Sequence, residues 1–193
     1  KARLECLHDL DTVEPMVVCL PVGEGRGMYS HKVPLPVRGT VTAAGREYVL
    51  DAEECFAILD IHKAHYPRKT WWKWATFAGK DGKGRRIGLN LTRNVVIDDA
   101  LNENAVWVDG KLHPLGTARF DLDSEDWSMG TEDGAVELSF DAQDERREDL
   151  NLGLVVSRFR QRFGTFSGPV RIGEEVIEVE DLFGVVEDHH AVW

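Results

Sequence analysis

Turn-forming residues recur about every ten positions along this chain of 193 residues, and they separate short runs rich in β-branched and aromatic side chains. The turns lie at residues 43–45, 80–84, 109–110, 133–134, 167–169 and 172–173. The Asp109-Gly110 pair stands between two such runs, which is a strong signal for a β-hairpin. Regular short strands with few helical periods are typical of an antiparallel sandwich or barrel, so an all-β fold is predicted.

Two brief segments are the helical candidates. Residues 51–55 begin with an acid, and residues 143–150 are polar on every side. A helix without an apolar stripe has no face to bury against a core. We therefore expect residues 143–150 to form a solvated loop or a single turn.

Composition narrows the range of partners. The formal net charge is -11, and 42% of the residues are hydrophobic, as in an ordinary folded domain. An acidic surface repels phosphates, so no nucleic-acid partner is expected. The longest uncharged run falls far short of the roughly 20 apolar residues that cross a bilayer, so no membrane span is expected either.

The three cysteines are widely spaced and odd in number. Cys6, Cys19 and Cys55 fit neither a disulfide framework nor a zinc motif. We interpret them as reduced, mostly buried thiols, which are typical of a cytoplasmic protein.

One short segment, ILDIHKAHYPRKTWWKWATFAG, contains an acid, two histidines, a tyrosine and three tryptophans. Side chains alternate between two faces along a strand. If the runs on either side of HYPRK are strands, Asp60 and His62 point to one side of the first, and Trp72 and Trp74 share a side of the second. An acid–base pair near stacked indoles is typical of an enclosed apolar pocket with a few polar groups. The two strands are expected at 56–63 and 70–78.

Several motifs, taken in order, resemble those of a known domain family. The matching pieces are ILDIHKAHYPRKTWWKWATFAG, GRRIGLNLT, NENAVWVDGKLHPL, RQRFGTFSG and LFGVVEDHHAVW. The set resembles an uncharacterised bacterial and fungal family related to carotenoid hydratases (hydroxyneurosporene synthases), AttH-like proteins and tocopherol cyclase. The resemblance implies a lipocalin-like, calycin-like antiparallel β-barrel over residues 37–193, the second of two tandem barrels. Residues 1–36 would then be junction strands, which either complete this barrel or continue from a preceding barrel domain.

The resemblance also implies a class of chemistry. Relatives in this wider group act on hydrophobic, often isoprenoid-like molecules, and they hydrate or cyclise an alkene by proton transfer without a metal or organic cofactor. The motifs here depart from those of carotenoid hydratases. We therefore expect a hydrophobic small-molecule ligand in a Trp-lined barrel pocket, with cofactor-free hydration, cyclisation or isomerisation as candidate reactions. Two alternatives stay open: a non-catalytic carrier of a lipophilic ligand, and a purely structural barrel of a two-barrel protein.

Protonating an alkene needs an acid with a raised pKa and aromatic faces that shield a cation. Asp60 is the first candidate for the acid. His62 could orient it or activate water, and Tyr66 could relay a proton. Trp72 and Trp74 would line the pocket. The alternative is that Asp60 and His62 form a buried hydrogen-bonded pair that holds the strand, with the tryptophans as core.

A second cluster lies near the end of the sequence, at EDHH. On a strand, Glu187 and His189 face one way while Asp188 and His190 face the other. Glu187 and His189 are therefore candidate ligand-binding residues, and the alternative is that they cap one end of the barrel.

Further polar residues are candidates for the pocket or for the outer surface. Asn90 could bind the polar head of a ligand, or it could satisfy backbone groups at a strand end. The row Arg158, Arg160 and Arg162 is expected on a solvated outer face, which would turn Gln161 inward to the pocket. No metal site is expected, because the histidines lack the spacing that zinc sites favour.

Overall fold

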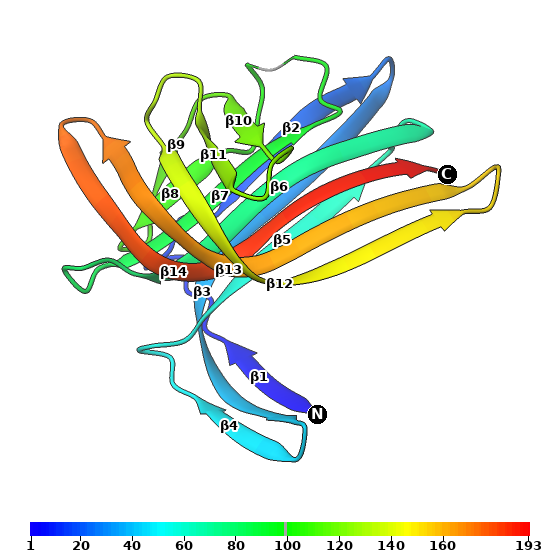
Figure 1. The fold of residues 1–193 in the computed structure, drawn as a ribbon. Helices are drawn as coiled ribbons and strands as arrows, with labels where there is room; N and C mark the ends of the chain where they lie inside the picture. Colours follow the sequence, from blue (N-terminus) through cyan, green and yellow to red (C-terminus); the bar gives the residue numbers. More distant parts are fainter. Residues whose placement is uncertain (99) are drawn as a thin grey trace.

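The structure, a computed structural model, describes residues 1–98 and 100–193. Within those residues the chain forms fourteen β-strands and no helix, so the predicted all-β antiparallel fold is confirmed. The strands make two sheets of nine and five strands (Figure 1). The strands predicted at 56–63 and 70–78 are present, each slightly longer than expected.

The larger sheet is curled, and its strands are antiparallel throughout (Figure 1). Its order is β10-β11-β12-β13-β14-β6-β7-β8-β9, so β6 pairs with β14 from the far end of the chain. The curl brings β10 near β7, and the sheet encloses its own interior as a half-barrel. The bounds are β6 Lys69–Lys80, β7 Arg86–Asn94, β8 Ala105–Val108, β9 Lys111–Pro114, β10 Ala118–Asp121, β11 Trp127–Thr131, β12 Glu137–Asn151, β13 Val156–Ile172 and β14 Glu175–Val192.

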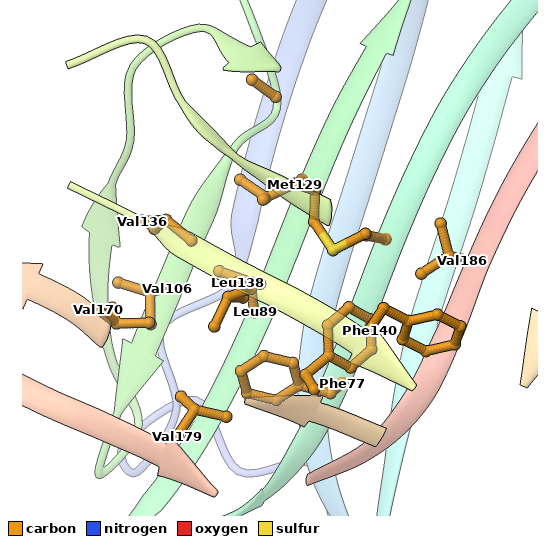
Figure 2. Packing of buried hydrophobic residues seen from close by; sticks show 14 of the residues in the cluster. Phe77, Leu89, Val106, Met129, Val136, Leu138, Phe140, Val170, Val179 and Val186 are labelled. Carbon is orange, nitrogen blue, oxygen red and sulfur yellow. The ribbon is translucent and has the colours of Figure 1, made fainter. Parts of the chain in front are cut away.

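Apolar side chains fill the interior of the curl (Figure 2). Phe77 of β6, Leu89 of β7 and Val186 of β14 are almost fully buried there. Phe166 of β13 lies between Phe77 and Phe140 of β12, with ring centroids 5.3 and 4.8 Å away. Because side chains alternate along each strand, the next residues on β6, β7 and β14 point out of the interior to the opposite face of the sheet.

The smaller sheet is built around β3, Arg26–Ala43, which is long enough to pair with four other strands. One half of β3 pairs with β2 and β5, and the other half pairs with β1 and β4 (Figure 1). The partners are β1 Ala2–Cys6, β2 Met16–Gly23, β4 Arg46–Leu50 and β5 Phe56–Ala64. The expected division of the chain between residues 36 and 37 lies inside β3, and the proposed two-barrel arrangement stays a prediction.

The β2-β3-β5 part of the smaller sheet packs on the outward face of the larger one. Met16 of β2 contacts Trp107 of β8, and Met28 of β3 belongs to a cluster with Tyr66. At Gly88 of β7 the two sheets approach closely, because a Cβ atom there would lie 2.9 Å from the ring of Pro34. A side chain at this position would push the sheets apart.

Two expectations about local structure were wrong. Residues 143–150 are part of the long strand β12, which pairs with β13 from Ser139 to Asn151 with one register shift between Ala142 and Asp144. The segment is exposed on both faces, so it has no apolar alternation to reveal it, and its ladder hydrogen bonds come from a strand further along the chain. The cysteines are unpaired as expected, but Cys6 and Cys19 are exposed instead of buried. Within the described residues, no helix of a length and apolarity suited to crossing a membrane is found.

Candidate functional site

A cavity of about 320 Å³ lies between the smaller sheet and the outward face of the larger sheet. It is therefore outside the filled interior of the half-barrel, and the expectation of a pocket inside the barrel is corrected. The cavity takes its position from the second sheet, which covers the polar and aromatic face of β6 and β7. Its lining includes six of the predicted site residues: Asp60, His62, Tyr66, Trp72, Trp74 and Glu187.

The wall formed by the larger sheet consists of two rows of cross-strand neighbours. Glu187 of β14 stands opposite Trp74 of β6, and Gln161 of β13 stands opposite Glu187. In the next row His189 stands opposite Trp72. Residues directly opposite in an antiparallel pair point to the same face. Trp72 and Trp74 therefore share a face of β6, and Glu187 and His189 share a face of β14, as predicted. Strand pairing places both pairs on one surface of the sheet.

The wall formed by the smaller sheet consists of two cross-strand pairs. Lys32 of β3 stands opposite Asp60 of β5, and Ser30 stands opposite His62. Asp60 and His62 do share a face, as predicted. Their cross-strand neighbours on that face are the ammonium of Lys32 and the hydroxyl of Ser30.

Lys32 is the centre of charge in this wall. Its Nζ atom lies 2.7 Å from Oδ2 of Asp60 and 3.7 Å from Oε2 of Glu103. It also lies 5.4 Å from the ring centroid of Trp74, within cation–π range. The side chain of Lys32 is only 1% exposed, so the two carboxylates and the indole replace its hydration.

Glu103 is a site residue that the sequence analysis missed. It lies in the segment before β8, and its side chain is 1% exposed. Oε2 accepts from Ser30 Oγ over 2.5 Å, and Oε1 accepts from Asn94 Nδ2 over 3.2 Å. Burial raises the pKa of Glu103, but the charge of Lys32 and the hydrogen bonds of His62 and Ser30 outweigh burial, so its pKa lies below the usual value. Glu103 is therefore a buried carboxylate.

Hydrogen-bond partners determine the tautomer of His62. Its Nε2 atom lies 3.3 Å from Oδ1 of Asp60 and 3.3 Å from Oε2 of Glu103. Carboxylates only accept hydrogen bonds, so Nε2 carries a proton. The Nδ1 atom lies 3.2 Å from the hydroxyl of Tyr66. Burial raises the pKa of Tyr66 to about 12, helped by the charges of Glu103 and Asp60, so the hydroxyl keeps its proton. Two acceptors lie 3.2 Å from that hydroxyl, Nδ1 of the Nε2–H tautomer of His62 and Sδ of Met28.

Glu187 is the ionisable group of the opposite wall. Trp72 Nε1 donates to Oε1 over 2.5 Å, and Gln161 Nε2 donates to Oε2 over 2.8 Å. Burial raises the pKa of Glu187 above the usual value, although the hydrogen bonds of Trp72 and Gln161 act in the opposite direction. The cavity thus has the ionised carboxylate of Glu103 on one side and the carboxyl of Glu187, which resists ionisation, on the other.

Three of the predicted ligand-binding residues stand behind the cavity wall. Asn90 accepts from Trp74 Nε1 over 2.8 Å and donates to the backbone oxygen of Glu103 over 2.6 Å, so it ties the segment that carries Glu103 to β6. Gln161 holds Glu187. The ring of His189 packs edge-on against Trp72 at 4.2 Å, and its Nε2 pairs with Ser157 Oγ at 2.9 Å. Burial lowers the pKa of His189, which favours a neutral ring.

The arginine row on β13 differs from the expectation. Arg162 is buried and binds Glu145 and Glu125, and its guanidinium lies 4.4 Å from the ring centroid of Trp127. Arg160 also contacts that ring, at 4.9 Å. These arginines cover an indole at the mouth of the half-barrel, and Arg158 alone is largely solvated. Across residues 1–98 and 100–193, no group of three or more His, Cys, Asp or Glu side chains is arranged to hold a metal ion.

Lys32 and Glu103 share a physical reason for being missed. Each is a charged residue whose neighbours in the sequence do not indicate burial. Each is buried by a partner far away in the chain. Lys32 shares a strand face with Met28 and Ser30, which are also buried, but Tyr29 and His31 between them do not mark this face as the buried one. Glu103 lies between two asparagines, and nothing in that triplet predicts burial.

The chain is similar in sequence to a protein family and in fold to a solved structure. No curated protein matches the sequence. Kievitone hydratase from Nectria haematococca, a solved structure, is 12% identical with a TM-score of 0.44, over 86% of this chain and 53% of that chain. The chain thus spans about half the length of that protein. The model of a family described as Domain of unknown function (DUF2804) matches residues 3–193. The predicted membership of an uncharacterised family is confirmed, and the relation to carotenoid hydratases stays a prediction. The match extends over nearly the whole chain, half-barrel and covering sheet together, and the protein therefore belongs to the DUF2804 family.

Proposed function

We propose that the cavity binds a hydrophobic, isoprenoid-like molecule and that its two opposed ionisable walls transfer protons to and from an alkene of that molecule without a cofactor. The observation that carries the proposal is the opposition of Glu187, whose pKa is raised by burial, to the carboxylates of Asp60 and Glu103 across one cavity. Titratable groups whose environments push their pKa values apart are the usual mark of an acid and a base in one site.

Glu187 is the proposed acid. A protonated Glu187 would give its proton to one alkene carbon, and the electron pair of the double bond would form the new C–H bond. The neighbouring carbon would become cationic. Trp72 and Trp74 line the cavity next to Glu187, and indole faces attract cations. This assignment replaces Asp60 as the first candidate acid, because Asp60 is engaged in an ion pair with the ammonium of Lys32 at 2.7 Å, whereas Glu187 has no cationic partner within the described ion pairs.

Asp60 and His62 form the proposed basic wall. In hydration, a water molecule would attack the cationic carbon, and its proton would pass to Asp60 and later return to Glu187. In isomerisation or cyclisation, the same base would instead remove a proton from a carbon beside the cation. Glu103 and Tyr66 would hold His62 with its Nε2 proton towards Asp60.

The two alternatives make different demands on the site. A structural barrel predicts a filled interior, and the interior of the half-barrel is filled, but a structural role leaves the cavity between the sheets without a purpose. A lipophilic carrier needs the cavity but not a charged cluster, since burying Lys32, Glu103 and Glu187 costs free energy that apolar lining would not. The cluster therefore favours chemistry over carriage.

Turnover in ²H₂O tests the proposal. Candidate ligands are first found by quenching of tryptophan fluorescence, with retinoids, carotenoid fragments, terpenols and fatty acids as the panel. Bound compounds are then incubated in ²H₂O, and mass spectrometry is used to look for one deuterium on carbon. We expect deuterium incorporation that Glu187→Gln abolishes and that the exposed control Glu178→Gln on β14 leaves unchanged. Saturable binding without incorporation would favour a carrier, and no binding by any class would remove the proposal for this chain.

A further inference from the structure

Acidic groups outnumber ammonium groups among the ionisable side chains that line the cavity. Among the described residues that line the cavity, three carboxyl groups, Asp60, Glu103 and Glu187, face one ammonium, Lys32. At a pH where the imidazole of His62 is neutral, two carboxylates stand against one cation even if Glu187 is protonated. A ligand that enters this cavity therefore meets net negative charge at its polar end.

The one ammonium in the lining is already occupied. Lys32 contacts Asp60 and Glu103, lies over Trp74, and has a side chain that is 1% exposed. An anionic group of a ligand could reach Lys32 only by displacing these partners, which would leave one of the two carboxylates without its counter-ion. Lys32 is therefore not available for an ion pair with a carboxylate or phosphate of a ligand, which is the usual way of binding such groups.

Asp60 is the more exposed of the two carboxylates in the same cluster. Its side chain is 27% exposed, whereas that of Glu103 is 1% exposed. Oδ2 is used by Lys32, and Oδ1 lies 3.3 Å from His62 Nε2. A carboxylate has about four acceptor positions, so Asp60 keeps capacity for a donor from the cavity. A hydroxyl group on the ligand would supply that donor.

We infer that the cavity takes ligands whose polar end donates hydrogen bonds and carries no negative charge, as in an alcohol or phenol, and that it rejects carboxylates and phosphate esters of the same carbon skeleton. The inference rests on the proposed function, which supplies the hydrophobic ligand, and it names the head group. Asp60 is the specificity-determining acceptor in this account, and Lys32 holds it in place.

A matched series of ligands tests the inference. Geraniol, geranylamine, geranic acid and geranyl diphosphate share a carbon skeleton of a size suited to the cavity. Dissociation constants are measured by tryptophan quenching at pH 8, where an ordinary imidazole is neutral. We expect geraniol to bind at least tenfold more tightly than geranic acid, the diphosphate to bind weakest, and the amine to equal or exceed the alcohol. Equal or tighter binding of geranic acid would overturn the inference while leaving the proposed apolar pocket in place. Binding by none of the four would contradict the pocket itself and the inference with it.

A variant at Asp60 separates the head-group contact from binding of the carbon skeleton. Asp60→Asn removes the negative charge and keeps the size of the side chain. The ratio of geranic acid to geraniol dissociation constants should fall at least threefold towards one. Asp121→Asn, at an exposed position on β10 away from the cavity, should leave the ratio as in the parent protein. An unchanged ratio in a folded Asp60→Asn protein would exclude Asp60 as the acceptor.

Discussion

The indole nitrogen of Trp72 donates a hydrogen bond of 2.5 Å to Oε1 of Glu187, although 115 positions separate the two residues in the chain. The bond runs diagonally across the β6–β14 pair, since Glu187 stands directly opposite Trp74. It joins the aromatic wall of the cavity to the carboxyl group that we propose as the acid. The ionisation of Glu187 thus depends on an indole that also lines the cavity.

Replacing Trp72 by Phe should raise the pKa of Glu187 further. The N–H bond of Trp72 favours the carboxylate and so opposes the effect of burial, and phenylalanine has no donor. The pKa is followed by NMR of the side-chain carboxyl carbon during a pH titration. Trp71→Phe removes an indole from the adjacent position on β6 and should leave the pKa unchanged. A fall in the pKa of Glu187 in Trp72→Phe would contradict the account.

Replacing Glu187 by Gln should make the protein more stable at neutral pH. Because burial raises the folded-state pKa of Glu187 above the unfolded value, the folded state holds the extra proton between the two values. Stability is then lost as pH rises from about 4.3, the ordinary value for glutamate, through the raised folded-state pKa. Glutamine keeps the acceptor for Trp72 but cannot ionise. Thermal unfolding from pH 4 to 8 should show Tm falling with pH more steeply in the parent protein than in Glu187→Gln. Parallel curves for the two proteins would refute the prediction.

Replacing Glu103 by Gln should destabilise the protein by roughly 3 kcal/mol. Breaking a buried ion pair by removing one partner costs about 3–5 kcal/mol, and Lys32 keeps Asp60 as a remaining counter-ion, which places the loss at the lower end. The pKa of Glu103 lies below its usual value, so its contribution is present above the unfolded-state pKa and is lost as pH falls through the folded-state pKa. Urea unfolding measures the loss at pH 7, with the exposed Glu53→Gln as control. A loss below about 0.5 kcal/mol, the ordinary range of surface changes, would count against a buried ion cluster.

Replacing Tyr66 by Phe should remove the hydrogen bond to Nδ1 of His62 and leave the proton on Nε2. Asp60 and Glu103 hold that proton on Nε2, and we expect Nδ1 to accept from the hydroxyl of Tyr66 in the parent protein. Nitrogen-15 NMR of the imidazole at pH 8 should show one Nε2–H tautomer, and Tyr66→Phe should show Nδ1 shifted towards the value of a ring without an acceptor bond. Tyr48→Phe, at an exposed position on β4, is the matched control. Identical Nδ1 signals in the parent and Tyr66→Phe proteins would mean that the hydroxyl serves Met28 instead, whose Sδ atom lies 3.2 Å away.

The sequence was most informative where structure follows from local alternation. The pairs Asp60 with His62 and Trp72 with Trp74 share faces because a strand repeats every two residues. It was least informative for β12, whose segment 143–150 carries no alternation because neither face is buried. It also placed the pocket inside the barrel, where Phe77 and its neighbours already fill the space.

What the sequence by itself determined is which side chains of one strand point together, and that the fold is made of antiparallel strands, since both follow from short-range periodicity and turn residues. The tertiary structure decided which of the two faces would carry the site. Pairing of β14 with β6 brings Glu187 beside Trp72, and pairing of β3 with β5 brings Lys32 beside Asp60. Pairing between strands so far apart in the chain depends on how the whole apolar surface is buried. The identities of the paired residues alone therefore do not predict it. The cavity and its charged cluster therefore exist only after the two sheets have packed together.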